Sequence, residues 1–188
     1  GIAGRVTYAF KDTYLAEFNM GYTGSENFAP NHRFGFFPAV SGGWVISNEP
    51  FFESARKVVD LLKIRASYGK VGNDEIGGSR RWIYEPTVDT NASGWQYGEK
   101  GDQGGGGVRV GEVANPYVSR EEAGKFDVGI EISLFNVLRL QADYFSETRE
   151  GIFIPAASIP AMFGLSTKPY PNVGETLNRG FEVTIEYA

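Results

Sequence analysis

The residue types that carry most enzyme chemistry are scarce in this sequence. It contains no cysteine and a single histidine, His32. A thiolate metal site, a cysteine nucleophile, a histidine-based metal site and a Ser-His-Asp triad therefore have nothing to build on. The four glycines at 104–107 lack the following Lys-Ser/Thr pair of a phosphate-binding loop, and a flexible loop explains them better. We expect no enzyme activity, no catalytic residue, no metal and no cofactor, and we interpret His32 as a solvated loop residue.

Two other groups of side chains are suited to binding rather than to reaction. Three aromatic residues of a long, glycine-rich region could stack on sugar rings, with packing inside the loop as the alternative; they are Trp82, Trp95 and Tyr97. Six charged residues lie within strand-like segments and would line a water-filled lumen; they are Lys63, Arg65, Asp127, Glu131, Arg139 and Asp143. Because Asp127 and Glu131 lie two pleats apart on one strand face, lining a channel suits them better than acid–base catalysis.

Strands of alternating polarity must position these charges. Residues 125–153 predict two strands around a very short turn at 136–137. The charged residues would occupy one face, and the other would carry Phe126, Val128, Ile130, Ile132, Leu134, Leu138, Leu140, Ala142 and Tyr144. Further strands are predicted at 5–10, 14–22, 34–47, 62–72 and 179–188, with one more at 81–88. The one helix-like pattern predicts a short helix near 50–60, capped by Asn48.

Composition and charge narrow the class of protein. The chain has 188 residues and a formal net charge of -5, which argues against a nucleic-acid binder. Aromatic residues make up 14% and glycine 25 residues, as in a β-rich protein with many turns. No stretch approaches the ~20 apolar residues of a helical membrane span, whereas a barrel strand needs only about ten alternating residues. The chain lacks a start methionine and a signal peptide, and we expect it to be a piece of a longer protein.

The lengths of the connections alternate between short and long. The links at 11–13 and 136–137 are short, and those at 23–35, 73–120 and 154–178 are long. Outer-membrane barrels have short periplasmic turns and long outer loops. If both short turns are periplasmic, the predicted strands alternate in direction along the chain and every long connection begins and ends on the outer side. We predict an all-β fold of antiparallel transmembrane strands, whose apolar face meets lipid. Tyrosines near the strand ends fit an aromatic girdle, although aromatics also favour strands generally; they are Tyr14, Tyr22, Tyr68, Tyr144 and Tyr187.

Five ordered sequence blocks resemble SusC/RagA-like TonB-dependent outer-membrane transporters. They are GSENFAPNHRFGFFPAVSGGWVISNEPFF, LLKIRASYGKVGND, NPYVSREEAGKFDVGIE, DYFSETREGIF and NVGETLNRGFEVTI. One departure is Arg120, where that family often has tryptophan. The five blocks cover most of the chain outside 74–112.

The resemblance implies a slice of a barrel of about 22 strands. A plug domain and a TonB-contact segment would precede residue 1, and further strands would follow Ala188. The whole protein would lie in the outer membrane of a Bacteroidetes-type, Gram-negative bacterium. It would import oligosaccharides or peptides with a SusD-like lipoprotein and energy from the TonB complex.

Two other functions remain open at this point. A passive porin would share the strand alternation but not the five blocks. A soluble β-rich carbohydrate-binding module would pack the apolar face at 126–134 against a second sheet.

Overall fold

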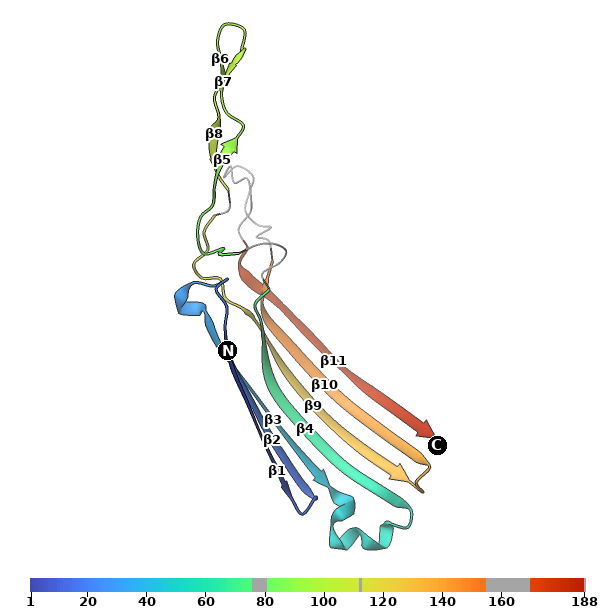
Figure 1. Cartoon of the computed structure of the whole chain (residues 1–188). Helices are drawn as coiled ribbons and strands as arrows, with labels where there is room; N and C mark the ends of the chain where they lie inside the picture. Colours follow the sequence, from blue (N-terminus) through green and yellow to red (C-terminus); the bar gives the residue numbers. More distant parts are fainter. Residues whose placement is uncertain (76–80, 112, 155–169, 188) are drawn as a thin grey trace.

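Seven long strands form one antiparallel sheet in the order β1-β2-β3-β4-β9-β10-β11. The computed structural model describes residues 1–75, 81–111, 113–154 and 170–187. The strands are β1 (Ile2–Phe10), β2 (Tyr14–Gly24), β3 (Phe34–Val45), β4 (Val59–Asn73), β9 (Glu121–Leu134), β10 (Leu138–Phe153) and β11 (Asn172–Tyr187). Figure 1 shows a curved wall with the chain ends at opposite edges. The wall is an open section of a barrel, because β1 and β11 each have one paired neighbour.

Two tight turns close the lower end of the sheet in Figure 1. The first is formed by Lys11 and Asp12, with φ of 53° and 50°, and the second by Phe135 and Asn136, with φ of 55° and 56°. Two successive residues with positive φ form the type I′ turn, whose twist matches that of the flanking strands. Both predicted turns are confirmed, the second one residue earlier than predicted.

The connection between β3 and β4 contains two 3₁₀ helices, η2 (Ile46–Asn48) and η3 (Pro50–Ala55). A short helix near 50–60 was predicted, but η3 ends earlier, because β4 already pairs with β9 from Val59 onward. The predicted cap is wrong. The N-cap position of η3 is Glu49, without a side-chain cap, and Asn48 instead donates from Nδ2 to the Asp12 carbonyl at 2.8 Å.

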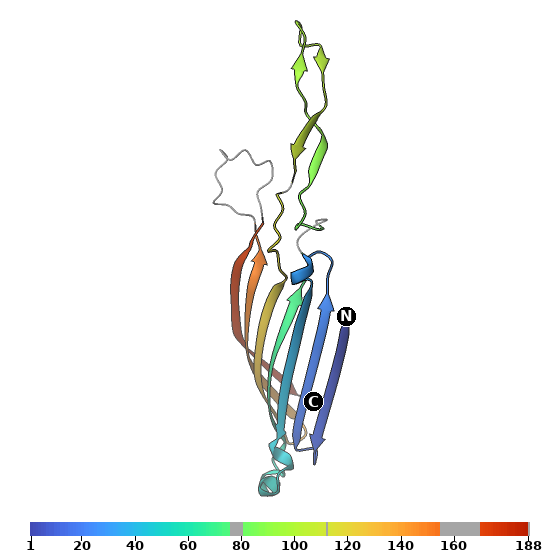
Figure 2. The same cartoon turned by 90° about the vertical axis from the view of Figure 1, so that its left-hand side faces the viewer.

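The long connection between β4 and β9 projects beyond the upper end of the sheet (Figures 1 and 2). It contains β5 (Val88–Ala92), β6 (Gln96–Tyr97), β7 (Gln103–Gly104) and β8 (Gly107–Val110), paired as β5-β8 and β6-β7. The prediction of irregular structure for this glycine-rich stretch is therefore wrong in part. A Cβ at Gly94 would overlap the Gly105 carbonyl, so glycine lets the two backbones approach each other.

The predicted strand at 81–88 is also wrong. Trp82 has a φ of 51°, and the Glu85 N–H donates to the Trp82 carbonyl at 2.9 Å. This local turn interrupts the extended pattern. Strand β5 begins only at Val88.

The large apolar side chains of the sheet lie together on one exposed face, called here the apolar face. Cross-strand register places Ile130 of β9 beside Ile64 of β4 and Ala142 of β10. Exposed fractions on this face include 54% for Val40 and 81% for Phe181. No second sheet covers it among the described residues. An exposed apolar surface of this extent marks an interaction face rather than a soluble surface.

The opposite face, called here the polar face, is the better buried of the two. Along β2 the apolar-face residues are exposed, and most residues between them are half-buried. This burial pattern is the reverse of that in a soluble protein, where apolar side chains are the buried ones.

Aromatic residues end the apolar runs of several strands. At the upper end of their runs, Tyr144 of β10 and Phe181 of β11 pack with ring centroids 4.9 Å apart. Near the lower end, Tyr14 of β2 and Trp44 of β3 stack at 6.4 Å. Two aromatic bands around an apolar belt are the pattern of membrane barrels. Tyr14 and Tyr144 of the predicted girdle thus lie at opposite ends of the apolar runs, although Tyr144 is in the middle of β10 and not near its end as predicted.

A small buried core lies outside the sheet, where the long connections leave it. Phe28, Ile83 and Val118 form it, with Phe153 of β10 packed against them. It joins the 25–33 loop, the start of the long connection and its end. The sequence pattern did not indicate this core, because its members come from irregular segments.

Candidate functional site

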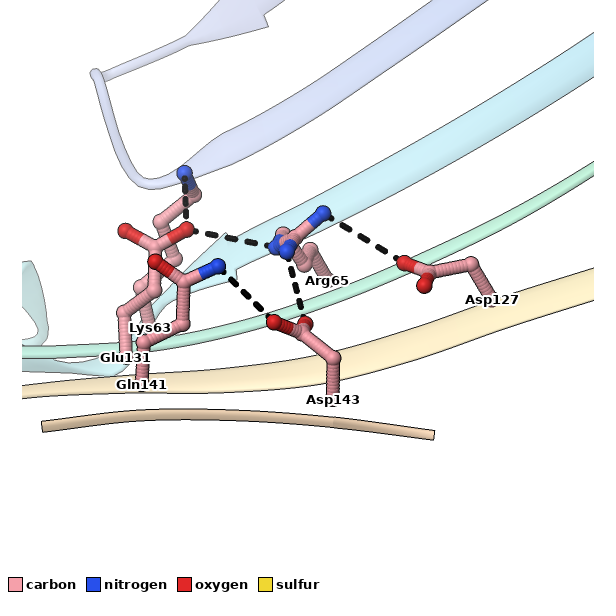
Figure 3. A network of polar contacts seen from close by, with 6 residues as sticks. All are labelled: Lys63, Arg65, Asp127, Glu131, Gln141 and Asp143. Atoms are coloured by element: carbon pink, nitrogen blue, oxygen red, sulfur yellow. Dashed lines mark hydrogen bonds and ion pairs between the residues drawn. The ribbon is translucent and has the colours of Figure 1, made fainter. Parts of the chain in front are cut away.

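Five of the six predicted lumen-facing charges meet on the polar face, across β4, β9 and β10 (Figure 3). Arg65 is at the centre. It donates from Nη2 to Asp143 Oδ1 at 2.6 Å and from Nη1 to Asp127 Oδ1 at 3.3 Å. Its Nε lies 3.3 Å from Glu131 Oε1, and Lys63 Nζ approaches the same oxygen at 3.3 Å. We call these five residues the charge cluster.

The strand register creates the charge cluster. Arg65 of β4, Gly129 of β9 and Asp143 of β10 lie in one cross-strand row. A Cβ at Gly129 would overlap Asp143 Oδ1 and lie 3.1 Å from Arg65 Nε. The guanidinium therefore crosses β9 over the one residue type that leaves it room. Nothing in the strand pattern marked Gly129 for this role.

Charge and burial determine what the cluster can do. Its two cations and three carboxylates sum to a formal charge of -1, with side-chain exposures from 10% for Asp143 to 35% for Arg65. Gln141 adds a donor, from Nε2 to Asp143 Oδ2 at 2.8 Å. Because each carboxylate already has a cation or amide partner, the cluster suits a rigid, charged wall lining rather than acid–base chemistry.

The sixth predicted residue, Arg139, lies apart from the charge cluster. It is paired across the sheet with Glu186 of β11, Nη1 to Oε2 at 3.6 Å. The two side chains are 64% and 62% exposed. A pair this exposed contributes little to stability.

A hollow of about 400 Å³ lies beside the charge cluster on the sheet. Small side chains on three strands make room for it, among them Ala9, Ser41 and Ser67, and Arg65 and Asp127 stand at its border. The hollow offers hydroxyl groups and both signs of charge to whatever fills the space in front of the wall.

The three aromatic candidates are not brought together. Residues 88–110, which contain β5 to β8, are called here the projecting ribbon. Trp95 and Tyr97 lie on it and are 80% and 52% exposed. Trp82 is 47% exposed and directly precedes Ile83 of the small buried core. Among the described residues no ring contact joins any two of the three side chains, so they do not form a single stacking platform.

Arg120 has a structural role that the sequence pattern missed. It is 7% exposed, and its guanidinium lies 5.5 Å from the ring centroids of both Phe28 and Phe37. It donates from Nη1 to the Thr23 carbonyl at 3.1 Å and from Nη2 to the Arg33 carbonyl at 2.7 Å. Arg120 thereby fastens the 25–33 loop to the start of β9. The departure from the resembled motif at this position was the only available signal.

Asn172 closes the same end of the sheet. Its Nδ2 donates to the carbonyls of Ser119 at 2.7 Å and Gly151 at 2.8 Å, and its Oδ1 accepts from the Ser119 N–H at 3.0 Å. One side chain therefore satisfies backbone groups from two other segments. Strand β11 begins at this residue, whereas a loop was predicted up to 178; residues 155–169 of that predicted loop lie outside the described residues.

Neither a metal-binding cluster nor a membrane-spanning helix occurs among the described residues. His32 is exposed at the end of η1 (Pro30–His32). In the described ranges, no group of three or more histidine and acidic side chains is placed to hold a metal. The helices of the described residues are all too short or too polar to cross a membrane.

The family follows from a match over the whole chain. Residues 1–188 match the family described as TonB dependent receptor-like, beta-barrel. The chain belongs to this family. TonB-dependent receptor barrels are outer-membrane proteins, receptors and transporters rather than enzymes.

Named relatives agree with this assignment. TonB-dependent receptor P3 of Formosa agariphila is 31% identical over 185 residues, which are 98% of this chain and 17% of that protein. TonB-dependent receptor SusC of Bacteroides thetaiotaomicron is 27% identical over 184 residues, 97% of this chain and 18% of that protein. The chain thus spans about a sixth of the length of the curated relatives it matches.

Solved structures show the same wall. The RagAB peptide importer in its closed-closed state matches with a TM-score of 0.81 and 27% identity, over 98% of this chain and 19% of that chain. The open-open state of the same importer matches with a TM-score of 0.78. The predicted SusC/RagA-like resemblance and the barrel fold are confirmed.

Proposed function

We propose that this chain is part of the wall of a transporter that imports nutrients across the outer membrane with energy supplied through TonB. The observation that carries the proposal is the inverted sheet. Its large apolar side chains lie exposed on one face and the charge cluster lies on the other, within a chain that matches the receptor barrel family from end to end. The polar face, with the charge cluster and Arg139, would line the lumen.

The partners follow from the same likeness. A relative is named SusC, and a matching solved structure is the RagAB peptide importer. We therefore assign to the parent receptor a SusD-like lipoprotein on its outer side, and a plug domain and TonB-contact segment outside this chain. The cargo class is an oligosaccharide or a peptide.

The projecting ribbon is our candidate for early contact with cargo. Trp95 and Tyr97 present exposed rings there, and exposed rings stack on sugars or on apolar peptide side chains. Trp82, beside the small buried core, would contribute only where the ribbon meets the wall.

The soluble-module alternative conflicts with the exposed apolar face, and a passive porin conflicts with the family.

Cysteine labelling distinguishes the faces. In native membranes, Ile130→Cys should resist a water-soluble maleimide that labels an exposed ribbon variant, Trp95→Cys. Fast labelling at position 130 would overturn the proposed orientation of the wall.

The transport claim needs a separate test in the host bacterium. Uptake of labelled oligosaccharides and peptides should fall to background when either the parent receptor or TonB is deleted. The parent receptor should co-purify with its lipoprotein from the outer membrane. Uptake that is lost with the receptor but persists without TonB would indicate a passive channel.

A further inference from the structure

Residues 46–58, called here the rim segment, lie at the lower end of the wall, where the short turns are (Figure 1). Hydrogen bonds fix the segment at both ends. Asn48 donates to the Asp12 carbonyl in the β1–β2 turn, and the Val58 carbonyl accepts from the Phe135 N–H in the β9–β10 turn at 3.0 Å. The rim segment is therefore held against the lower edge, which is the periplasmic side if the long connections are extracellular.

Glu49 places the rim segment on the membrane-facing side. Its Oε1 accepts from the Tyr14 hydroxyl at 2.5 Å and from Trp44 Nε1 at 3.1 Å. Tyr14 and Trp44 are the stacked aromatic pair on the apolar face, 48% and 39% exposed. Because the carboxylate holds both rings from below, the rim segment continues the apolar face past its aromatic band.

The rim segment displays apolar side chains in this position. Phe51 follows Pro50 at the start of η3 and is 70% exposed. Val58 and the neighbouring turn residue Phe135 are 46% and 62% exposed. Three exposed apolar side chains therefore lie on a hydrogen-bonded rim next to the apolar face, and exposed apolar groups in such a position suit a membrane interface.

Two cations follow the exposed phenyl group. Arg56 donates from Nε to the carbonyl of the buried Ser47 at 2.6 Å, so its guanidinium is anchored at one side. No carboxylate of the described residues forms an ion pair with Arg56 or Lys57. Within the segment, Glu49 is already engaged, and Glu53 is the other acidic residue.

We propose that the rim segment is a lipid-binding anchor at the periplasmic leaflet of the outer membrane. Phe51 inserts at the boundary between headgroups and acyl chains, and Arg56 and Lys57 bind the phosphates of anionic phospholipid. Aromatic rings with neighbouring cations suit this boundary, because the acyl-chain side is apolar and the headgroup side is hydrated and negatively charged. The anchor fixes the height and tilt of this part of the wall in the bilayer, and it does not depend on the cargo.

The insertion of Phe51 is tested with the full-length parent receptor in vesicles of phosphatidylethanolamine and phosphatidylglycerol. A fluorescent label is attached to Phe51→Cys, or to the control Glu53→Cys, after removal of any other reactive cysteine in the parent. Glu53 lies on the same 3₁₀ helix but on a different side from Phe51, because only residues three apart eclipse in such a helix. The label at 51 should be quenched by a lipid spin label near the headgroup and protected from iodide. The label at 53 should be quenched more by iodide. Equal iodide quenching at both positions would overturn the anchor.

The phosphate contact is tested in the same labelled receptor. Brominated phosphatidylglycerol should quench the label at 51 more efficiently than brominated phosphatidylcholine. The double variant Arg56→Gln with Lys57→Gln should remove this preference. Each lost cation should lower the affinity for phosphatidylglycerol relative to phosphatidylcholine by roughly fivefold. Lys70→Gln, near the opposite end of β4, is the matched control and should leave the preference unchanged. Heat-modifiable migration on gels verifies that each variant is folded, and an unchanged preference in the folded double variant would refute phosphate binding.

Discussion

Gly129→Ala should destabilise the wall, although alanine is normally the better strand residue. The added Cβ would overlap Asp143 Oδ1 and lie 3.1 Å from Arg65 Nε, so the 2.6 Å bond between Arg65 and Asp143 must break or lengthen. A hydrogen bond to a charged group contributes about 1.5–3 kcal/mol. Because the Arg65 side chain is 35% exposed, solvent screening lowers this. We expect a loss of about 1–2 kcal/mol in the free energy of unfolding.

Gly43→Ala is the matched control. Gly43 faces Arg65 from the other neighbouring strand, in the same cross-strand row and on the same face. A Cβ there would meet Leu15 Cβ at 3.5 Å and the Ile64 carbonyl at 3.8 Å, which are ordinary contacts. This variant should be neutral or stabilised by about 0.5 kcal/mol, because alanine restricts the unfolded chain.

The assay is chemical unfolding of the purified parent receptor in detergent, followed by tryptophan fluorescence. A double-mutant cycle with Arg65→Gln separates the cause. If Gly129→Ala acts through the Arg65–Asp143 bond, more than half of its cost should disappear in the Arg65→Gln background. Equal costs in both backgrounds, or equal effects of the Gly129 and Gly43 substitutions, would refute the reasoning.

Three further outcomes follow from the same structure. Ile130→Arg places a charge on the apolar face and should make the free energy of folding into vesicles less favourable by about 2–4 kcal/mol. Ser133→Arg, on the polar face, should cost less than about 1 kcal/mol. Equal costs would contradict the assignment of faces. Arg120→Ala leaves the backbone carbonyls of Thr23 and Arg33 without this donor and should cost about 2–3 kcal/mol, visible as faster proteolysis of the outer loop in an otherwise intact barrel. Trp95→Ala should weaken cargo uptake by several-fold without changing receptor abundance, with Val108→Ala as the ribbon control; unchanged uptake would remove Trp95 from the cargo site.

Much of the wall was predictable because barrel strands have a period of two. The apolar residues at 126–134 alternate with charged ones, and the two type I′ turns lie where the alternation breaks. Errors occurred where backbone pairing overrode the local pattern. Strand β4 begins at Val59, inside a segment with helical spacing, because pairing with β9 satisfies its backbone groups. Glycine-rich residues near Gly94 pair for the same reason, without any side-chain pattern to reveal it.

The candidate site was only partly predictable. Alternation placed Arg65 and Asp143 on one face, but their bond depends on Gly129 between them, a position that carries no periodic signal. The rim segment was visible as a short helix. That Glu49 also accepts from Tyr14, and so holds the segment beside the apolar face, depends on a contact across 35 residues.

The sequence by itself determined which residues share a face, where the chain turns and which family the chain resembles. These properties are local, because side-chain direction in a strand depends on parity and a type I′ turn on two adjacent residues. The tertiary structure alone decided which charges meet, which end of the sheet holds the buried core and how the rim segment is oriented. Those properties depend on register between strands, which joins Arg65 to Asp143 across 78 residues, and on side chains such as Arg120 that reach backbone carbonyls up to 97 residues away.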